Sequence, residues 1–441
     1  KLDIGNIIDA YENNPEKLIE YNLKDIELTH KIIEKTNIIN YGLRVQQICP
    51  QKFDDFLFNS KIIENLLHHR YWNKHIYFPT KKEHDKLEYK GAIVLQPVAG
   101  IHKNVVVFDF SAMYTSIYIT FNYSPDTITT TSDDDNIKIN TDIGEFQYLS
   151  KSKKIGILPA LEYEMLIKRK EFQHERDKYD ADTIEYKIAD ELQGTFKTIL
   201  NSIYGIAAYA KFILFDTRIP ASITSTARQM LEFVKQNAIK QGFIPLYGDT
   251  DSIFISIPGK TEQDVIDKAI EFKNYMNNHW SEFIMQFTTN KDTIQNCALK
   301  LDLEKMYSKL LLTDVKKRYF GKINYYKGNL LEHTKIAVTG FETRRDDTPS
   351  FFKIKLEKIY ELILEHDITK IQKFVEEIEK DIYNCKPEDL MISIKLSKSL
   401  SEYTNLPIHV RALKNSKQTV QRGEKINMLY VKDKCEVTHY V

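Results

Sequence analysis

Residues 246–255, "LYGDTDSIFI", place two aspartates, Asp249 and Asp251, between two runs of hydrophobic residues. Each run has the length and composition of a buried β-strand, and a Gly-Asp pair is typical of the turn between paired strands. Burying a carboxylate without a partner is strongly unfavourable. The stretch therefore predicts a β-hairpin over 243–257 whose acids either occupy a surface turn or receive a positively charged partner.

The length and composition of the chain limit the function classes. With 441 residues, 42% of them hydrophobic, the chain can form about two to four domains. It has no apolar run near the roughly 20 residues of a membrane span and does not begin with a signal peptide. Because it begins Lys1-Leu2-Asp3 without a methionine, we expect it to be a piece of a longer protein.

Cysteine spacing and charge add two further limits. The four cysteines form no CxxC pair, which argues against a structural zinc site and a disulfide framework and fits a reducing compartment. Basic and acidic residues balance at 62 each, which counts slightly against a nucleic-acid enzyme. The Lys- and Arg-rich segments 300–327 and 395–434 are ordinary solvated surfaces unless they flank a phosphate-handling site.

Helical and strand patterns alternate along the chain. Helices are predicted over the first 40 residues, 159–179, 183–204 and 221–241, with Gly205 ending the third. Two long helices joined by a short polar turn predict an antiparallel helical hairpin. Segment 127–136 reads as an exposed loop, and helices alternate with basic loops from 353 onward. The order predicts an α+β fold with the acids in one layer.

Asp109 closes the hydrophobic run "KNVVVFDFSAMY" at 103–114, which predicts a buried strand. A carboxylate at the end of such a strand requires neutralisation, and Mg²⁺ binds one or two carboxylates together with water and substrate phosphate. If this strand lies beside the hairpin, Asp109 and Asp251 can bridge two ions for phosphoryl transfer. An ordinary hairpin turn remains the alternative for Asp249 and Asp251.

Three stretches, "DFSAMYTSI" (109–117), "KTILNSIYG" (197–205) and "YGDTDS" (247–252), resemble the polymerase signatures of the family B DNA polymerases in order and separation. The resemblance implies a right-hand fold, with a palm sheet that carries the acids, helical-hairpin fingers and a mainly helical thumb. It also implies five segments along the chain: a C-terminal remnant of a 3′–5′ exonuclease domain (1–40), a linker with the first part of the palm (41–150), the fingers (151–205), the second part of the palm (206–338) and the thumb (339–441).

The resemblance makes Asp109 and Asp251 the ligands of two Mg²⁺ ions, and the backbone carbonyl of Phe110 is expected to complete a metal shell. Asp249 becomes a supporting catalytic candidate. One ion would lower the pKa of the primer 3′-hydroxyl, and the other would neutralise the triphosphate and the leaving pyrophosphate.

Lys197, Asn201 and Tyr204 are spaced to share one face of a helix. An amphipathic helix is the alternative, but its stripe would normally be apolar. By resemblance Lys197 is catalytic and contacts phosphate, and Arg169 in "LIKRKEF" grips the incoming triphosphate through its planar fork of donors. The expected nucleotide-binding residues are Arg169, Lys197, Asn201, Tyr114, Ser111 and Met113.

Tyr114 resembles the family's steric gate, whose ring leaves no room for a ribose 2′-hydroxyl. A tyrosine after a strand is otherwise more often a core residue. The motif departs from the family in two places, because Ala112 stands where Ser is usual and Thr115 where Pro is usual. We expect these departures to tune the triphosphate pocket.

Further stretches resemble elements that hold primer and template. "VKKRYFGK" resembles the Lys-x-Tyr element at the primer terminus, "TGFETRRD" the start of the thumb, and "YKGA" a template-contacting element. Glu304 in "DLEKMY" matches an acid near the palm site. Contacts with phosphates give sequence-independent affinity. The expected primer and template residues are Tyr204, Gly205, Lys317, Tyr319, Tyr89, Gly91, Arg344 and Arg345.

"YNLKD" at 21–25 resembles the last signature of the 3′–5′ exonuclease, with Tyr21 and Asp25. The earlier exonuclease signatures would lie upstream. A single acid cannot hold two metals, so this chain as given is not expected to proofread.

The sequence thus predicts a DNA-templated DNA polymerase with primer-template DNA and deoxynucleoside triphosphates as partners and no membrane. A sliding clamp or another replication factor stays open as a further partner. The expected location is the cytoplasm if the source is prokaryotic or archaeal, and the host-cell compartment is unknown if the source is viral. The alternative is a catalytically degenerate polymerase-like DNA-binding protein, which would lack Asp109, Asp251 or Lys197. A protein-primed polymerase is disfavoured, because 118–196 is already filled by a loop and the helical hairpin.

Overall fold

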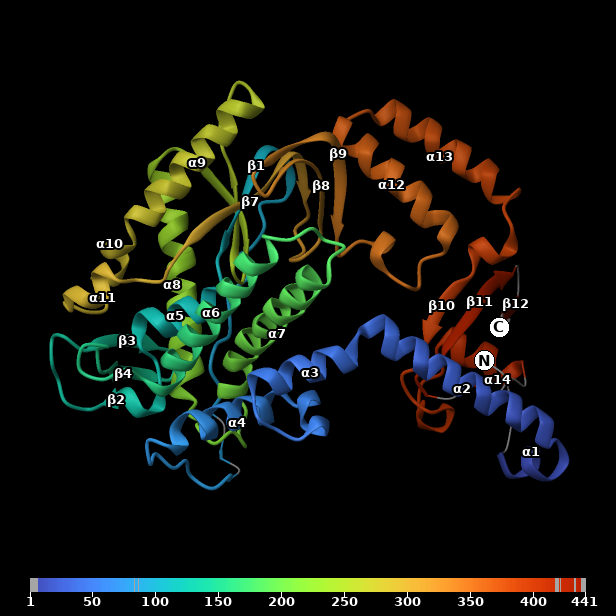
Figure 1. Cartoon of the computed structure of the whole chain (residues 1–441). Coiled ribbons are helices and arrows are strands. Elements are labelled where there is room, and N and C mark those ends of the chain that lie inside the picture. Colours follow the sequence, from blue (N-terminus) through green and yellow to red (C-terminus); the bar gives the residue numbers. More distant parts are fainter. Residues whose placement is uncertain are drawn as a thin grey trace. The chain divides into compact units, whose positions relative to one another are not determined.

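The computed structural model describes residues 7–82, 84–85, 87–416, 420, 422–431 and 434–437. The chain divides into two compact units, unit 1 (Lys1–Ile32, Pro97–Val105 and Met306–Val441) and unit 2 (Ile33–Gln96 and Val106–Lys305). Three elements in Figure 1 run from one unit into the other along the chain: α2 (Pro15–Thr36), β1 (Gly100–Phe110) and β7 (Leu301–Leu312). Each unit combines helices with a sheet, so the predicted α+β class is confirmed.

Unit 2 contains a sheet with strand order β5-β6-β1-β7 and a small sheet with order β2-β4-β3. The strands are β2 (Ile128–Thr129), β3 (Ile137–Thr141), β4 (Gly144–Tyr148), β5 (Ile244–Asp249) and β6 (Ser252–Ser256). The helices are α3 (Ile38–Ile48), α4 (Asn59–Trp72), α5 (Met113–Phe121), α6 (Ile157–Arg176), α7 (Ile184–Ala207), α8 (Arg218–Lys240), α9 (Glu262–Asn278), α10 (Trp280–Ile284) and α11 (Lys291–Gln295). Short 3₁₀ helices lie at Phe53–Leu57 and Pro125–Thr127.

The strand that carries Asp109 has a hydrophobic centre, and its side chains at 105–108 are fully buried. The strand predicted over 103–114 exists as β1, but it ends at Phe110. Ala112 adopts a left-handed backbone with φ 45° and begins α5. A left-handed residue cannot continue a strand, so the chain turns at this point.

The hairpin predicted from the "YGDTDS" stretch is present as β5 and β6, which pair antiparallel with Asp249 opposite Ser252. Thr250 takes a left-handed backbone with φ 59°, and the Asp251 amide donates to the Asp249 carbonyl at 2.7 Å. A side chain at Gly248 would place its Cβ 3.0 Å from Leu95 Cδ1, so glycine allows the close packing here. The tight turn places the two acids side by side.

Helices α6 and α7 form the predicted antiparallel hairpin. Arg176 pairs with Asp190 at 3.2 Å, and Phe172 stacks on Phe196 with ring centroids 5.7 Å apart, so the residue numbers rise along one helix as they fall along the other. The prediction that Gly205 ends the second helix is wrong, because α7 continues to Ala207. A single glycine lowers helix propensity by only about 1 kcal/mol, which tertiary packing overrides.

Helix α8, predicted over 221–241 and found at 218–240, is largely buried and is rich in serine and threonine. Its hydroxyls make hydrogen bonds with other segments: Ser222 with Tyr148 at 2.8 Å, Thr226 with Tyr123 at 2.9 Å. Buried hydroxyls are tolerated when they are bonded in this way. These bonds attach α8 to the small sheet and to the end of α5.

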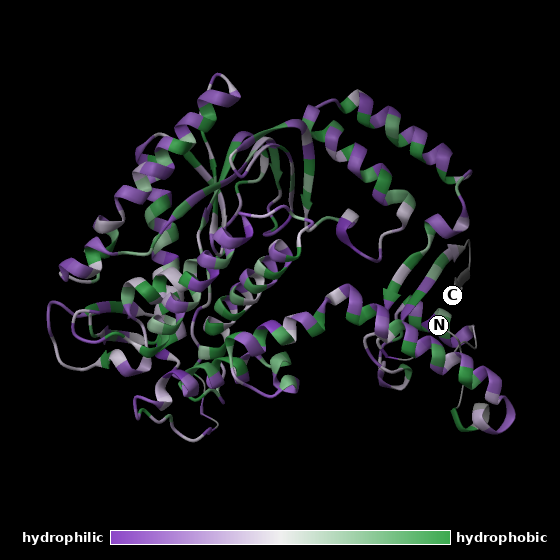
Figure 2. Ribbon diagram, viewed as in Figure 1, coloured by the Kyte–Doolittle hydropathy of each residue, from purple (hydrophilic) through white to green (hydrophobic). Residues whose placement is uncertain are grey.

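Unit 1 contains α1 (Ile7–Asn13) and a sheet with strand order β1-β7-β8-β9, formed with β8 (Tyr319–Tyr326) and β9 (Asn329–Thr339). Helices α12 (Ser350–Glu365) and α13 (Ile368–Ile382) lie side by side in Figure 1. Phe320 of β8 stacks on Tyr360 of α12 at 4.5 Å in a core completed by Val338 and Leu364. Hydrophobic and hydrophilic residues alternate along α13 in Figure 2, as expected for a helix with one buried face.

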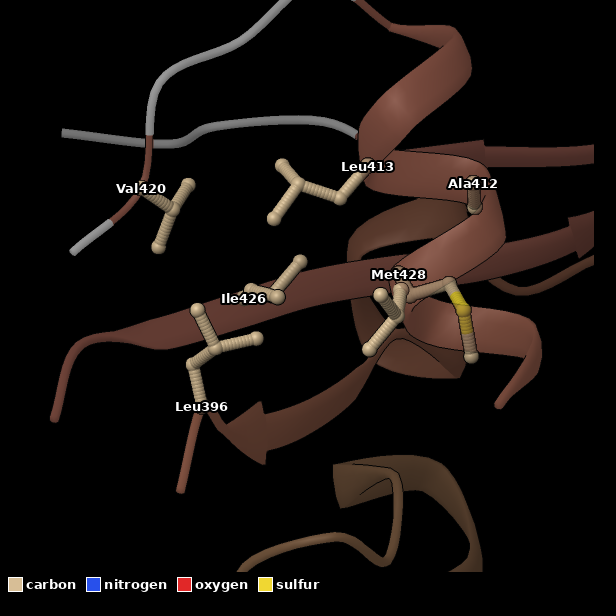
Figure 3. Packing of buried hydrophobic residues seen from close by; sticks show 7 residues of the cluster. Leu396, Ala412, Leu413, Val420, Ile426 and Met428 are labelled. Carbon is tan, nitrogen blue, oxygen red and sulfur yellow. The ribbon is translucent and has the colours of Figure 1, made fainter. Parts of the chain in front are cut away.

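The C-terminal part of unit 1 differs from the helices and basic loops that the sequence predicted. It holds a sheet with order β10-β11-β12, formed by β10 (Ile392–Lys395), β11 (Lys425–Val431) and β12 (Lys434–Val437), with helix α14 (Ile408–Asn415). Figure 3 shows the core between them, made of Leu396, Val410, Ala412, Leu413, Val420, Ile426 and Met428. Short 3₁₀ helices lie at Glu342–Arg344, Pro387–Leu390 and Leu400–Glu402. Among the residues described, no helix is long and apolar enough to cross a membrane.

Candidate active site

The two strands that carry the acids meet directly in unit 2. The Phe110 amide, next to Asp109, donates to the Asp251 carbonyl at 2.8 Å. Strands β6 and β1 are neighbours in the sheet, which fulfils the geometric condition that the sequence set for a joint site. Asp109 and Asp251 therefore belong to one site.

The start of β7 contributes two more acids beside β1. The Ser111 amide donates to the Lys300 carbonyl at 3.0 Å, and the Ser111 hydroxyl donates to the Asp302 carboxylate. Asp302 also pairs with the Lys300 ammonium at 3.1 Å. The role of Asp302 was missed in the sequence, because its partner Ser111 lies almost two hundred positions away. Glu304, which the sequence placed near the acids, follows two residues later on β7 and pairs with Lys305 at 3.1 Å.

The electrostatics of Asp109 reflect this crowding of acids. The pKa of Asp109 is raised to about 7, first by burial and then by the negative charges of Asp251, Glu304 and Asp302, against the opposing effect of Lys305. The ionised form of Asp109 is therefore disfavoured, and a cation nearby would stabilise it. In the described part of the chain, no group of three or more His, Cys, Asp or Glu side chains is arranged to hold a metal ion. Two carboxylates and carbonyl oxygens nevertheless match the hard oxygen ligands that Mg²⁺ takes when phosphate and water complete its shell.

An aromatic stack adjoins the acids. The rings of Tyr114 on α5 and Tyr204 on α7 are stacked with centroids 4.3 Å apart. Burial, followed by the charge of Asp251, raises the pKa of Tyr114. Burial, followed by a hydrogen bond with Tyr89, raises the pKa of Tyr204. The structure thus brings together three tyrosines that the sequence had assigned separately. Met113, next to Tyr114, is buried.

The predicted stripe on α7 is present, because Lys197 and Asn201 are exposed on the helix while Ile199, Leu200 and Ile203 are buried on its other side. Gly205, one turn beyond Asn201, is exposed and has open space where a side chain would be. The stripe is therefore polar and accessible.

Arg169 on the neighbouring helix α6 is half-buried. Its Nε atom is buried and has no hydrogen-bond partner within the described residues. Burial lowers the pKa of Arg169, though an arginine stays charged under all ordinary conditions. A partly buried guanidinium with an unused donor is suited to bind an anion.

The segment around Tyr89 and Gly91 is held by two residues that sequence reasoning missed. Arg228 Nη1 of α8 donates to the carbonyls of Lys90 at 2.6 Å and Gly91 at 2.7 Å. Asp142, in the β3–β4 turn, accepts from the Lys90 amide at 2.6 Å and from Arg228 at 3.3 Å. The chain then runs beside β5, where the Leu95 amide donates to the Gly248 carbonyl at 2.8 Å. These contacts place the segment next to the acid hairpin.

The residues expected to hold the primer lie in unit 1. Lys317 has a left-handed backbone with φ 61°, and Tyr319 begins β8. The carbonyl of Lys317 packs on Gly340, where an added Cβ would approach it to 2.1 Å. Arg344 Nε donates to the Val338 carbonyl at 3.3 Å, and Arg345 pairs with Asp347 through contacts of 2.8 and 2.6 Å. Arg345 thus has an internal partner for its charge.

Tyr21 and Asp25 lie four residues apart on one face of α2 in unit 1. Both are partly exposed, and the Asp25 carbonyl accepts a hydrogen bond from the Thr29 hydroxyl at 2.8 Å. Helix α2 buries no residue.

Comparisons with known proteins agree on one family. DNA polymerase family B matches residues 58–440. DNA polymerase 1 of Sulfolobus acidocaldarius is 28% identical over 426 residues, covering 90% of this chain and 45% of the relative. A DNA polymerase of Pyrococcus glycovorans is 27% identical over 440 residues, covering 97% of this chain and 52% of the relative. The chain spans about half the length of these curated relatives.

A solved structure is also similar. The family B DNA polymerase from the hyperthermophilic archaeon Pyrobaculum calidifontis matches with a TM-score of 0.63 and 24% identity, over 96% of this chain and 53% of that one. This likeness supports the fold.

Proposed function

Because the chain belongs to DNA polymerase family B, we propose that it is a DNA-directed DNA polymerase. It would add deoxynucleotides to the 3′-hydroxyl of a primer paired with a DNA template. The observation that carries the proposal is the hydrogen bond between the Phe110 amide and the Asp251 carbonyl, which joins the two acid-bearing strands. A site of this kind serves phosphoryl transfer.

Asp109, Asp251 and the Phe110 carbonyl would hold two Mg²⁺ ions. The fit rests on the half-buried Asp109 carboxyl, whose neighbours include further carboxylates. Such a set of oxygens favours a hard divalent cation over an isolated charge. When bound, the ions supply Lewis-acid activation of the primer hydroxyl and neutralise phosphate charge. Asp249, in the same turn, would have a supporting role.

The nucleotide would bind between the acids and the α6–α7 hairpin. Arg169 and Lys197 would hold the triphosphate, and Asn201 would contact a polar edge of the nucleotide. Fixed positive charges stabilise negative charge as it develops on the phosphates. The Tyr114 ring, stacked on Tyr204, would lie beneath the sugar and exclude a 2′-hydroxyl. Ser111 and Met113 would complete this pocket.

The template would pass the segment containing Tyr89 and Gly91, with Tyr204 and Gly205 opposite. Arg228 and Asp142 support this role, because they fix the backbone of that segment. In unit 1, Lys317 and Tyr319 would hold the primer terminus. Arg344 and Arg345 would contact duplex phosphates, with Arg345 exchanging Asp347 for phosphate.

The right-hand layout is part of the proposal. The palm would comprise 41–150 and 206–338, the fingers 151–205, and the thumb 339–441. Segment 1–40, with Tyr21 and Asp25, would be the end of an exonuclease domain.

Primer extension with Mg²⁺ tests the proposal. The unmodified chain should extend a primer on a template, and the Asp251→Ala variant should not. Asp267→Ala is the matched control, because Asp267 is an exposed aspartate on α9 in the same unit. Extension unaffected by Asp251→Ala would overturn the metal assignment. Binding of DNA without any extension by the unmodified chain would favour the degenerate, non-catalytic alternative.

A further inference from the structure

A carboxyl group is buried between α5 and α6, away from the acids of the candidate active site. Glu162 on α6 is 1% exposed. It falls on the buried stripe of that helix, four residues after Leu158 and three before Met165. A glutamate is rarely found in such a position unless it is paired. Glu162 therefore requires a physical explanation.

The groups that face Glu162 from α5 are hydroxyls. Thr115 and Tyr118 are one helical turn apart, 5% and 0% exposed. The Thr115 hydroxyl lowers the pKa of the Glu162 carboxyl, although it does not form a well-aligned hydrogen bond with it. Within the described residues, neither Glu162 oxygen nor the Tyr118 hydroxyl oxygen has a hydrogen-bond partner. Three buried polar groups thus share one site between two helices.

Protonation of Glu162 removes the free-energy cost of burying a charged carboxyl at this site. Burial, only partly offset by the Thr115 hydroxyl, raises the pKa of Glu162 to about 8. The other titratable groups acting on Tyr118 are phenols, contributed by α7, β4 and the segment before β1: Tyr204, Tyr148 and Tyr89. A neutral carboxyl has both a donor and an acceptor, and each hydroxyl can do both, so the three groups can satisfy one another once the proton is present.

We propose that Glu162 is a positioning residue, held neutral between α5 and α6, that sets the place of α5 in the nucleotide pocket and releases it when the carboxyl ionises. The inference rests on the proposed polymerase function. Tyr114, which stacks on Tyr204, directly precedes Thr115 in the first turn of α5. A charge on Glu162 would be buried without a cation beside it, and the strain would be relieved by separating α5 from α6. The nucleotide pocket would lose its aligned tyrosine.

The test measures KM for a deoxynucleotide in primer extension between pH 7 and 9. If only the neutral form is competent, the competent fraction falls about tenfold over this range, so KM should rise about tenfold. Glu162→Gln keeps a neutral side chain of the same shape, so its KM should stay within about twofold, with kcat at pH 7 unchanged. Glu164→Gln is the matched control, since Glu164 lies on the exposed face of the same helix and pairs with Arg70. Its profile should follow that of the unmodified chain.

A second variant tests the same site without altering Glu162. Thr115→Val removes the hydroxyl that lowers the Glu162 pKa, so the rise in KM should move to higher pH. Parallel KM profiles for the unmodified chain and Glu162→Gln would overturn the inference, as would a shift to lower pH in Thr115→Val. Absence of extension at pH 7 in the unmodified chain is a different result, because it overturns the proposed function and the positioning role together.

Discussion

Two acids of unit 2, the half-buried Asp109 and the buried Glu162, have raised pKa values with burial as the first cause, yet their neighbours differ in kind. Asp109 reaches about 7, and after burial the causes are the carboxylates Asp251 and Glu304. Glu162 reaches about 8 with only a hydroxyl, that of Thr115, acting against the rise. The first site accumulates negative charge, whereas the second contains none when its proton is bound. Similar pKa shifts thus indicate different means of stabilisation: a bound cation for Asp109 and a bound proton for Glu162.

The largest expected effect tests whether Asp109 serves a cation. Asp109→Asn keeps the shape and removes the charge, so primer extension should slow by on the order of 10³-fold. Without the ion, the melting temperature should not fall, because the substitution removes a half-buried charge that neighbouring carboxylates repel. Single-turnover extension and thermal unfolding measure the two effects, with Asp267→Asn as control. If Asp109→Asn extends the primer at nearly the rate of the unmodified chain, Asp109 is a structural acid, as Glu162 is, and does not bind a catalytic cation.

Arg169 extends the comparison to a partly buried side chain of positive charge. It lies on α6, as Glu162 does, and its buried Nε atom has no hydrogen-bond acceptor among the described residues. Arg169→Ala should raise the KM for deoxynucleotides by on the order of 10²-fold, since charge-assisted bonds to phosphate are lost. Lys168→Ala is the control, because Lys168 is exposed and pairs with Glu171 at 2.8 Å. Equal effects of the two substitutions would contradict a specific phosphate contact.

Protonation of Glu162 should also make the free energy of unfolding depend on pH. Its folded pKa of about 8 lies above the ordinary value of 4.5, so the folded state holds a proton that the unfolded state has released in this window. The stabilisation is complete below pH 4.5 and is lost as the pH rises towards 8. Between pH 6.5 and 8 the free energy of unfolding should fall by about 2 kcal/mol through this group. Denaturant unfolding of Glu162→Gln should lack this component, and identical pH dependence in both proteins would show that Glu162 is not protonated in the fold.

The smallest effect concerns the bond between Ser111 and Asp302, which fixes the backbone beside Asp109. Ser111→Ala should slow extension by about fivefold, equivalent to about 1 kcal/mol for one hydrogen bond. Steady-state kinetics measure the change, and Ser281→Ala on α10 is the control. A loss as large as that of Asp109→Asn would mean that the contribution of Ser111 to the nucleotide pocket far exceeds that of its bond to Asp302.

The sequence predicted the strand, hairpin and long helices around the acids of unit 2 because their signals are local, but it did not predict the small sheet β2-β4-β3. The hydrophobic run of β1, the Gly-Asp turn of the hairpin and the long helices of the α6–α7 pair each lie within a short window. The C-terminal sheet of β10, β11 and β12 was missed, since β10 and β12 are only four residues long and α14 lies between β10 and β11 in the chain. The helix end predicted at Gly205 was wrong because packing of α7 outweighs the propensity of one residue.

Parts of the candidate site could not be predicted, for a related reason. Asp302, Arg228 and Asp142 act through partners dozens to almost two hundred positions away, so no window of sequence contains the pair. Glu162 did give a signal, an acid on the apolar stripe of α6, but in sequence it resembles any charged residue of an amphipathic helix. Only its enclosure by α5 distinguishes the two cases.

The sequence by itself determined the acid-bearing strand and hairpin, the polar stripe of α7 and the family resemblance, because periodicity and motif spacing are properties of the covalent chain. Tertiary structure alone decided that Asp109 lies beside Asp251 and acids of β7, that Tyr114 stacks on Tyr204, and that Glu162 has hydroxyls for neighbours. Burial and the charges within a few ångströms set the pKa of each acid. Both depend on which distant segments pack together.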